Sequence, residues 1–149
     1  MPYHPAGIVS DLSAAAATAF HRIELNPVVL LHLTELGISM NAAPNSTVVP
    51  VEFNLNRNTL VGTGAAGTVI EIHTQGTAPQ ATALVENTAD GGGTITTLHR
   101  WFIPVVSGMI WVAAPNREPD CIAAEFIGIL NVSALAASIN AACYMVWEE

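Results

Sequence analysis

Short apolar segments, separated by turn-forming residues, fill most of the chain and restrict its fold more than any other feature of the sequence. In the stretch 68–74, for example, Ile70 and Ile72 alternate with polar residues, as in a half-buried strand. After residue 25, no stretch keeps the apolar period of a helix over several turns. The pattern therefore predicts an all-β sandwich or barrel.

About eight segments of this kind follow one another at intervals of roughly 8–14 residues, with Gly, Pro, Asn and Thr between them. Eight strands with Greek-key connections make a jelly roll. We therefore predict an all-β fold, a β-sandwich of about eight strands with jelly-roll-like connections. The expected strands are Val28–Thr34, Val48–Leu55, Thr68–Thr74, Ala81–Thr88, Thr94–Ile103, Val105–Ala113, Ile122–Ser133 and Asn140–Trp147.

The beginning of the chain differs from the rest, and we assign residues 1–25 to an N-terminal Ala-rich arm that precedes a β-sandwich domain at residues 26–149. Small apolar residues follow Asp11, a candidate helix N-cap, which predicts a short helix or an extended arm. Such an arm has little surface to bury in its own core, so it could dock on a neighbouring subunit, and a frayed terminus is the alternative. The candidate contact residues are Ala14, Ala15, Ala16, Ala17 and Phe20.

Charged residues are scarce, since they make up 11% of the 149 residues while apolar residues make up 51%. The four basic residues are all arginines, and lysine does not occur. Obligate interfaces are depleted of Lys, Glu and Asp, so we expect a homo-oligomer, although a surface coated with small polar residues would also fit. Trp is enriched at such contacts, and Trp101, Trp111 and Trp147 are candidate interface residues, with core packing as the alternative.

The formal net charge of −8 argues against nucleic acid as a direct partner, because binding to phosphates needs a basic patch. A membrane is not expected as a partner either. The stretch 126–147 has no charged residue and is long enough to span a bilayer, but it contains Asn131 and Asn140 and alternates as strands do. The start of the sequence lacks the basic and apolar segments of a signal peptide.

The histidines do not form a metal-binding motif in the sequence. They stand at positions 4, 21, 32, 73 and 99, with no closely spaced pair among them. His73 and His99 could meet across a sheet. Glu71 or Glu52 would then complete a metal site, but a polar cross-strand pair fits the pattern better. We therefore expect no metal site.

Two further features lack the context that a functional motif needs. The run Gly62–Gly67 has the spacing of a dinucleotide fingerprint, yet a strand rather than a helix is expected after it. Cys121 and Cys143 lie in apolar surroundings, which favours two buried reduced thiols over a single disulfide bridge. We expect no catalytic residues and no cofactor, and therefore a protein that is not an enzyme.

Taken together, the arm Asp11–Phe20, the strand series Val48–Ala113 and the closing pair Ala124–Asn131 and Ala141–Glu149 resemble head decoration (cement) proteins of tailed bacteriophages. The resemblance implies a structural virion protein that clamps the major capsid protein on the outer capsid surface and stabilises the shell against internal DNA pressure. It implies a trimer or a dimer, with the trimer favoured, assembled in the host cytoplasm.

Other interpretations stay open. The chain could be another virion component, such as a tail or fibre protein or a small jelly-roll shell subunit. It could also be a trimeric β-sandwich that binds a ligand or receptor, of the tumour-necrosis-factor or complement-globular type, which a bridge between Cys121 and Cys143 would favour. An enzyme of the cupin type comes last, because it would need bound metal.

Overall fold

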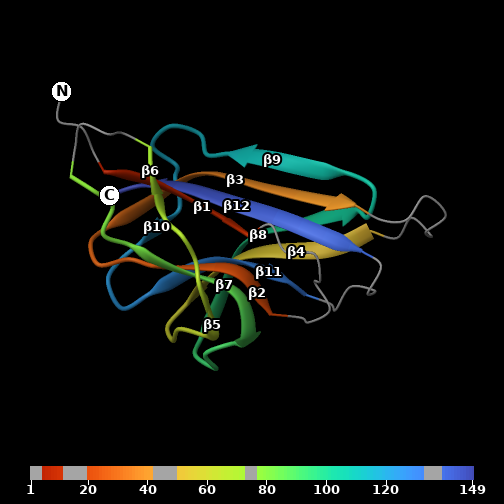
Figure 1. Cartoon of the computed structure of the whole chain (residues 1–149), viewed down its shortest axis with the longest axis horizontal. Coiled ribbons are helices and arrows are strands. Elements are labelled where there is room, and N and C mark those ends of the chain that lie inside the picture. The colour runs from red at the N-terminus through yellow and green to blue at the C-terminus, as the bar shows by residue number, and fades with distance from the viewer. Residues whose placement is uncertain (1–4, 12–19, 42–49, 73–76, 133–138) are drawn as a thin grey trace.

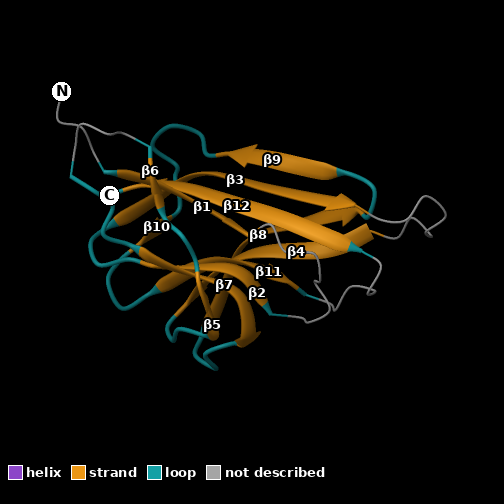
Figure 2. Cartoon of the chain, viewed as in Figure 1, coloured by secondary structure: helices purple, strands orange, loops and turns teal. Residues whose placement is uncertain are grey.

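The computed structural model describes residues 5–11, 20–41, 50–72, 77–132 and 139–149, and within these the chain forms strands and no helix (Figure 2). The strands build two antiparallel sheets that pack face to face (Figure 1). The all-β sandwich predicted from the sequence is thus confirmed. The strands are β1 (Ala6–Asp11), β2 (His21–Asn26), β3 (Leu31–Asn41), β4 (Pro50–Asn58), β5 (Thr63–Ala66), β6 (Ile70–Glu71), β7 (Thr82–Ala89), β8 (Ile95–Pro104), β9 (Gly108–Val112), β10 (Asp120–Cys121), β11 (Phe126–Asn131) and β12 (Asn140–Glu148).

The connections between the sheets are those of a jelly roll. Sheet A has the order β10-β3-β12-β1-β6, and β9 pairs with the edge of β3 that β10 also uses. Sheet B has the order β5-β7-β2-β11-β4-β8. Along the chain the main strands switch from one sheet to the other, except that β4 and β8 both lie in sheet B. The four main strands are in the order β1-β12-β3-β9 in sheet A and β2-β11-β4-β8 in sheet B. This arrangement bears out the predicted jelly-roll-like topology.

Three further strands between β4 and β8 extend the sandwich on one side. β7 pairs with β2 and β5 with β7 in sheet B, while β6 pairs with β1 in sheet A. Of the strand expected at 68–74, only Ile70 and Glu71 pair with a neighbour among the described residues. The expected strand at 28–34 is also displaced, because Val28 to Leu30 form an exposed loop and β3 runs on to Asn41.

The boundary predicted at residue 25 is wrong, because the described parts of the expected arm belong to the sandwich. β1 pairs with β12 along its whole length, from Ala6 opposite Glu148 to Asp11 opposite Cys143. β2 lies between β7 and β11. Val9 and Ile23, one from each strand, are fully buried in the core. Residues 1–4 and 12–19 of the expected arm lie outside the described part of the chain.

The core lies between the two sheets and is filled by inward side chains of every long strand. Among the largest fully buried side chains are Phe53 from β4, Ile129 from β11 and Trp147 from β12. Burying one such side chain stabilises the fold by about 1.5–3 kcal/mol. The described portion of the chain contains no helix long and apolar enough to cross a membrane.

A buried ion pair joins the two sheets at one end of this core. Nη2 of Arg22, on β2, donates a hydrogen bond of 2.7 Å to Oδ2 of Asp11, on β1. A register shift in the pairing of β2 with β11 lies at Arg22, and there its side chain reaches the opposite sheet. Because both groups are almost fully buried, removing one partner would leave an uncompensated charge in the interior.

Candidate functional site

Over β2 and β11, the middle strands of sheet B, the outer face is covered by another part of the same chain, whereas Phe102 of the edge strand β8 is 62% exposed on that face. Glu24 of β2 and Gly128 of β11 lie opposite each other and alternate with core residues, so both face away from sheet A. Glu24 is nevertheless fully buried. The backbone N–H of Gly62, which precedes β5, donates a hydrogen bond of 2.7 Å to Oε1 of Glu24. The loop that carries Gly62 is therefore fastened to the middle of sheet B.

A second contact fastens the loop after β7 to the same face. Nδ1 of His21 lies 2.7 Å from Oδ1 of Asp90 and 3.7 Å from Oε2 of Glu24. The side chains of His21 and Glu24 have no exposed surface, so no substrate can touch them in this conformation. The cluster therefore holds the covering loops in place, and its geometry does not suit catalysis.

The two carboxyl groups of this cluster are shifted in opposite directions. Burial raises the pKa of Glu24 above its ordinary value, although the hydrogen bond from Gly62 and the nearby His21 oppose the shift. Burial alone would also raise the pKa of Asp90, but its hydrogen bonds to His21 outweigh that effect and lower the value. His21 thus stabilises the charged form of Asp90, which lies in one of the loops that cover this part of sheet B.

The outer face of sheet A is bare and largely apolar. Ile110 and Val112 point outward from β9 and are 68% and 63% exposed. On β12 the outward residues Tyr144 and Val146 are half-buried, and on β1 they pair with Ser10 and Ile8. No described segment of the chain lies over this face in the way that the loops near Gly62 lie over sheet B (Figure 1).

The one acidic group near the middle of this face has a partner. The hydroxyl of Tyr144 donates a hydrogen bond of 2.5 Å to Oε1 of Glu35 on the neighbouring strand β3. Burial, together with the bond to Glu35, raises the pKa of Tyr144 to about 12. A carboxylate that could make the face polar is thus paired with a neighbouring hydroxyl.

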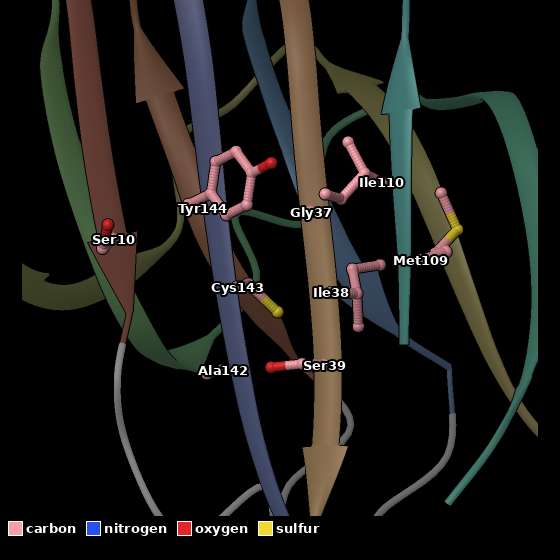
Figure 3. A pocket seen from close by; sticks show the side chains of 9 residues that line it. All are labelled: Ser10, Gly37, Ile38, Ser39, Met109, Ile110, Ala142, Cys143 and Tyr144. Carbon is pink, nitrogen blue, oxygen red and sulfur yellow. The ribbon is translucent and has the colours of Figure 1, made fainter. Parts of the chain in front are cut away.

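A shallow hollow lies in the same face, beside this pair (Figure 3). Its volume is about 310 Å³. The hollow lies between the ring of Tyr144, which packs over Gly37, and the side chain of Ile110 (Figure 3). The other outward-facing residues that line it are Ser10, Ser39 and Ala142.

The structure places the predicted interface residues in different surroundings. Trp101 of β8 and Trp111 of β9 are half-buried, with ring centroids 6.2 Å apart, and close the open side of the sandwich between these two edge strands. Phe20 is half-buried just before β2. Residues 14–17, the four candidate alanines, lie outside the described residues. The sequence did not single out Ile110 or Tyr144.

The prediction for Trp147 as an interface residue is wrong. Its side chain is fully buried, because β12 is a central strand of sheet A and Trp147 points inward. Gly7, opposite it on β1, leaves the space that the indole ring fills, since a Cβ there would lie 2.5 Å from the ring. Trp147 therefore stabilises the core of the single chain and has no surface to offer a partner.

The residues considered for a metal site do not come together. His99 stacks on Trp101 at a centroid distance of 5.6 Å, and Glu52 pairs with Arg100 at 2.9 Å. His73 lies outside the described residues, and Glu71 belongs to β6. Among the residues with described positions, no three His, Cys, Asp or Glu side chains form a group that could hold a metal ion.

The two cysteines are free and buried, in keeping with the preferred prediction. Cys121 belongs to β10 and Cys143 to β12. Burial raises the pKa of both thiols to about 12. Neither is therefore a reactive nucleophile near neutral pH.

These features define a jelly-roll β-sandwich with one covered and one bare outer face. No family model, no curated protein and no solved structure matches the chain. The fold and these two faces are therefore the features from which a function can be inferred.

Proposed function

We propose that this protein is a structural virion component, an oligomeric cement protein that decorates and stabilises a tailed-bacteriophage capsid. The observation that carries the proposal is the bare apolar face of sheet A, in a chain with only 11% charged residues. Large apolar surfaces on soluble proteins mark contacts with other proteins or with membranes. The buried polar groups of sheet B hold the fold together and offer no accessible reactive group.

The proposed partner is the major capsid protein on the outside of the shell, and the proposed assembly is a trimer. A protein that binds only the assembled shell stabilises that state by mass action. An oligomer also multiplies weak contacts, because once one subunit has bound, the next binds at a high effective concentration. The net charge of −8 suits a protein that works outside the shell and away from the packaged DNA.

The test uses shells assembled from the major capsid protein of the same phage, in their compact and expanded forms. We expect the protein to sediment with expanded shells until their sites are saturated, and to raise the temperature at which those shells break. Absence of sedimentation with either form would overturn the proposal. A stable trimer that binds neither form of the shell would instead favour the ligand- or receptor-binding alternative.

A further inference from the structure

We infer that the outer face of sheet A is the surface through which copies of this chain bind one another, with Ile110 of one copy seated in the hollow beside Gly37 of another. The inference deepens the proposed function, because it assigns the self-association which that function requires. It does not depend on the capsid, since any oligomeric role would use the same surface.

The first argument is the cost of leaving this face in water. Ile110 and Val112 stand side by side on β9, and β9 is an edge strand of sheet A among the described strands. Exposed edge strands with apolar side chains tend to pair or aggregate unless charges protect them. β9 carries no charged residue. A bound neighbour would remove both exposed side chains from water, which favours association.

The second argument is shape. The hollow at Gly37 and the exposed side chain of Ile110 belong to the same face and lie next to each other (Figure 3). A surface that carries an apolar projection beside an apolar hollow is complementary to another copy of itself. Two copies related by a two-fold axis would exchange projections, and a head-to-tail arrangement would form a ring if its rotation closes and an open filament if it does not. In either case each hollow receives one projection.

The third argument is charge, and it selects a second copy as the partner. Most faces of a chain with a net charge of −8 would repel the same face of another copy. The middle of sheet A lessens this cost, since it carries only one acidic group, Glu35, which accepts a hydrogen bond from Tyr144. The longest stretch of the sequence without Asp or Glu, residues 91–117, also includes β9. A strongly basic partner would find a single carboxylate in the middle of this face, and a strongly acidic partner would find no basic group there.

The experiment compares the native mass of the intact chain and three variants by light scattering, with circular dichroism as a check on folding. Ile110→Asp puts a charge on the projection, and Ala142→Phe fills the hollow from β12 without touching the core. Leu60→Asp is the matched control, because Leu60 is a similarly exposed apolar residue at 54% but belongs to the loop over sheet B.

We expect the intact chain and Leu60→Asp to have the same oligomeric mass, a multiple of 15.6 kDa. Ile110→Asp and Ala142→Phe are expected to remain folded and to dissociate at protein concentrations at least tenfold higher than the intact chain does. An unchanged oligomer in both variants would overturn the inference. So would an equal loss of mass in the Leu60→Asp control.

The same samples separate this inference from the proposed function. A monomeric chain that still binds expanded shells would overturn the inference and the oligomeric part of the proposed function, and would leave only the binding to the capsid standing. An oligomer that Ile110→Asp dissociates, but that binds no shells, would support the inference and contradict the capsid role.

Discussion

The two outer faces of the sandwich differ in how far their side chains are covered. Residue type alone would leave the polar outward residues of sheet B in water and cover the apolar outward residues of sheet A, but the structure does the reverse. On sheet B the outward residues include a histidine and a glutamate, and the chain folds its own loops over them until they are fully buried. On sheet A the outward residues include Ile110 and Val112, and they stay in the open. Buried polar groups and exposed apolar groups are the informative exceptions to ordinary burial. The loops thus cover the middle of sheet B within one chain, whereas the middle of sheet A stays exposed and is the surface proposed above to bind a second copy.

The largest predicted difference is in the free energy of unfolding of two variants that each add one methyl group, Gly128→Ala in the middle of sheet B and Gly37→Ala in the middle of sheet A. In Gly128→Ala the new Cβ would lie 2.4 Å from the backbone oxygen of Ile23, so strand β2 has to move. We expect a loss of about 2–3 kcal/mol in the free energy of unfolding, measured by urea denaturation.

Gly37→Ala is the matched change on sheet A. There the new Cβ would meet only the ring of Tyr144, 2.1 Å away, and a ring at the surface can swing aside. We expect a loss below about 1 kcal/mol. Equal losses in the two variants would contradict the view that only sheet B is closely covered.

A smaller effect on stability should distinguish Glu24, which is buried under the loops of sheet B, from Glu35, which is paired with Tyr144 on sheet A. Because burial raises the pKa of Glu24, the native state keeps a proton that the unfolded state releases above pH 4.5. The free energy of unfolding therefore falls as the pH rises from that value to the native pKa. Glu24→Gln removes this fall and keeps an oxygen to accept the bond from Gly62. We expect a gain on the order of 1 kcal/mol at pH 8, measured by thermal unfolding across the pH range.

Glu35→Gln on sheet A is the control for this experiment. That variant keeps Glu24, so its free energy of unfolding should still fall as the pH rises above 4.5. If Glu24→Gln were instead less stable than the intact chain at pH 8, the contacts of the charged carboxylate would outweigh its cost of burial.

The smallest effect is the titration of Tyr144 on sheet A, followed in a Tyr3→Phe background because the sequence has a second tyrosine. The pKa of Tyr144, about 12, lies above its ordinary value of 10.0, so the native state loses stability as the pH rises between these values. In Glu35→Gln the bonded carboxylate is gone, and the pKa of Tyr144 should fall toward 10.0. Ultraviolet titration of tyrosinate measures it. The same variant tests the pairing of Glu35, since an unchanged pKa would mean that burial alone sets it.

The sequence predicts the strands whose apolar residues follow a regular pattern. It does not show which strands pair with each other when the partners are far apart in the chain. β4 and β8 follow from apolar runs bounded by turns. β1 was missed because its six residues contain Ala, Gly and Ser, and because its partner β12 lies at the other end of the chain. Ile70 and Ile72 follow the strand pattern, yet both are exposed, since β6 is a two-residue strand at an edge.

The candidate surface could be anticipated only in part. Scarce charge predicts an interface but does not locate it, and the tryptophans singled out for that role include one that fills the core. A better signal was present in the strand predicted at 105–113, where both parities are apolar. Met109 and Trp111 pack on the core, so Ile110 and Val112, which alternate with them, must point away from the core. The hollow beside them could not be read from the sequence, because Gly37 and Tyr144 meet only in the folded sheet.

The position of β12 also has a consequence for how the protein is made. β12 lies between β1 and β3, which do not pair with each other, so the centre of sheet A is formed by a strand that is synthesised after the other eleven. Until residues 140–148 emerge from the ribosome, the inward side chains of β3 have no neighbour on that side. Pairings so distant in sequence form slowly and leave apolar surface open to aggregation. The nascent chain should therefore depend on chaperones until β12 has emerged.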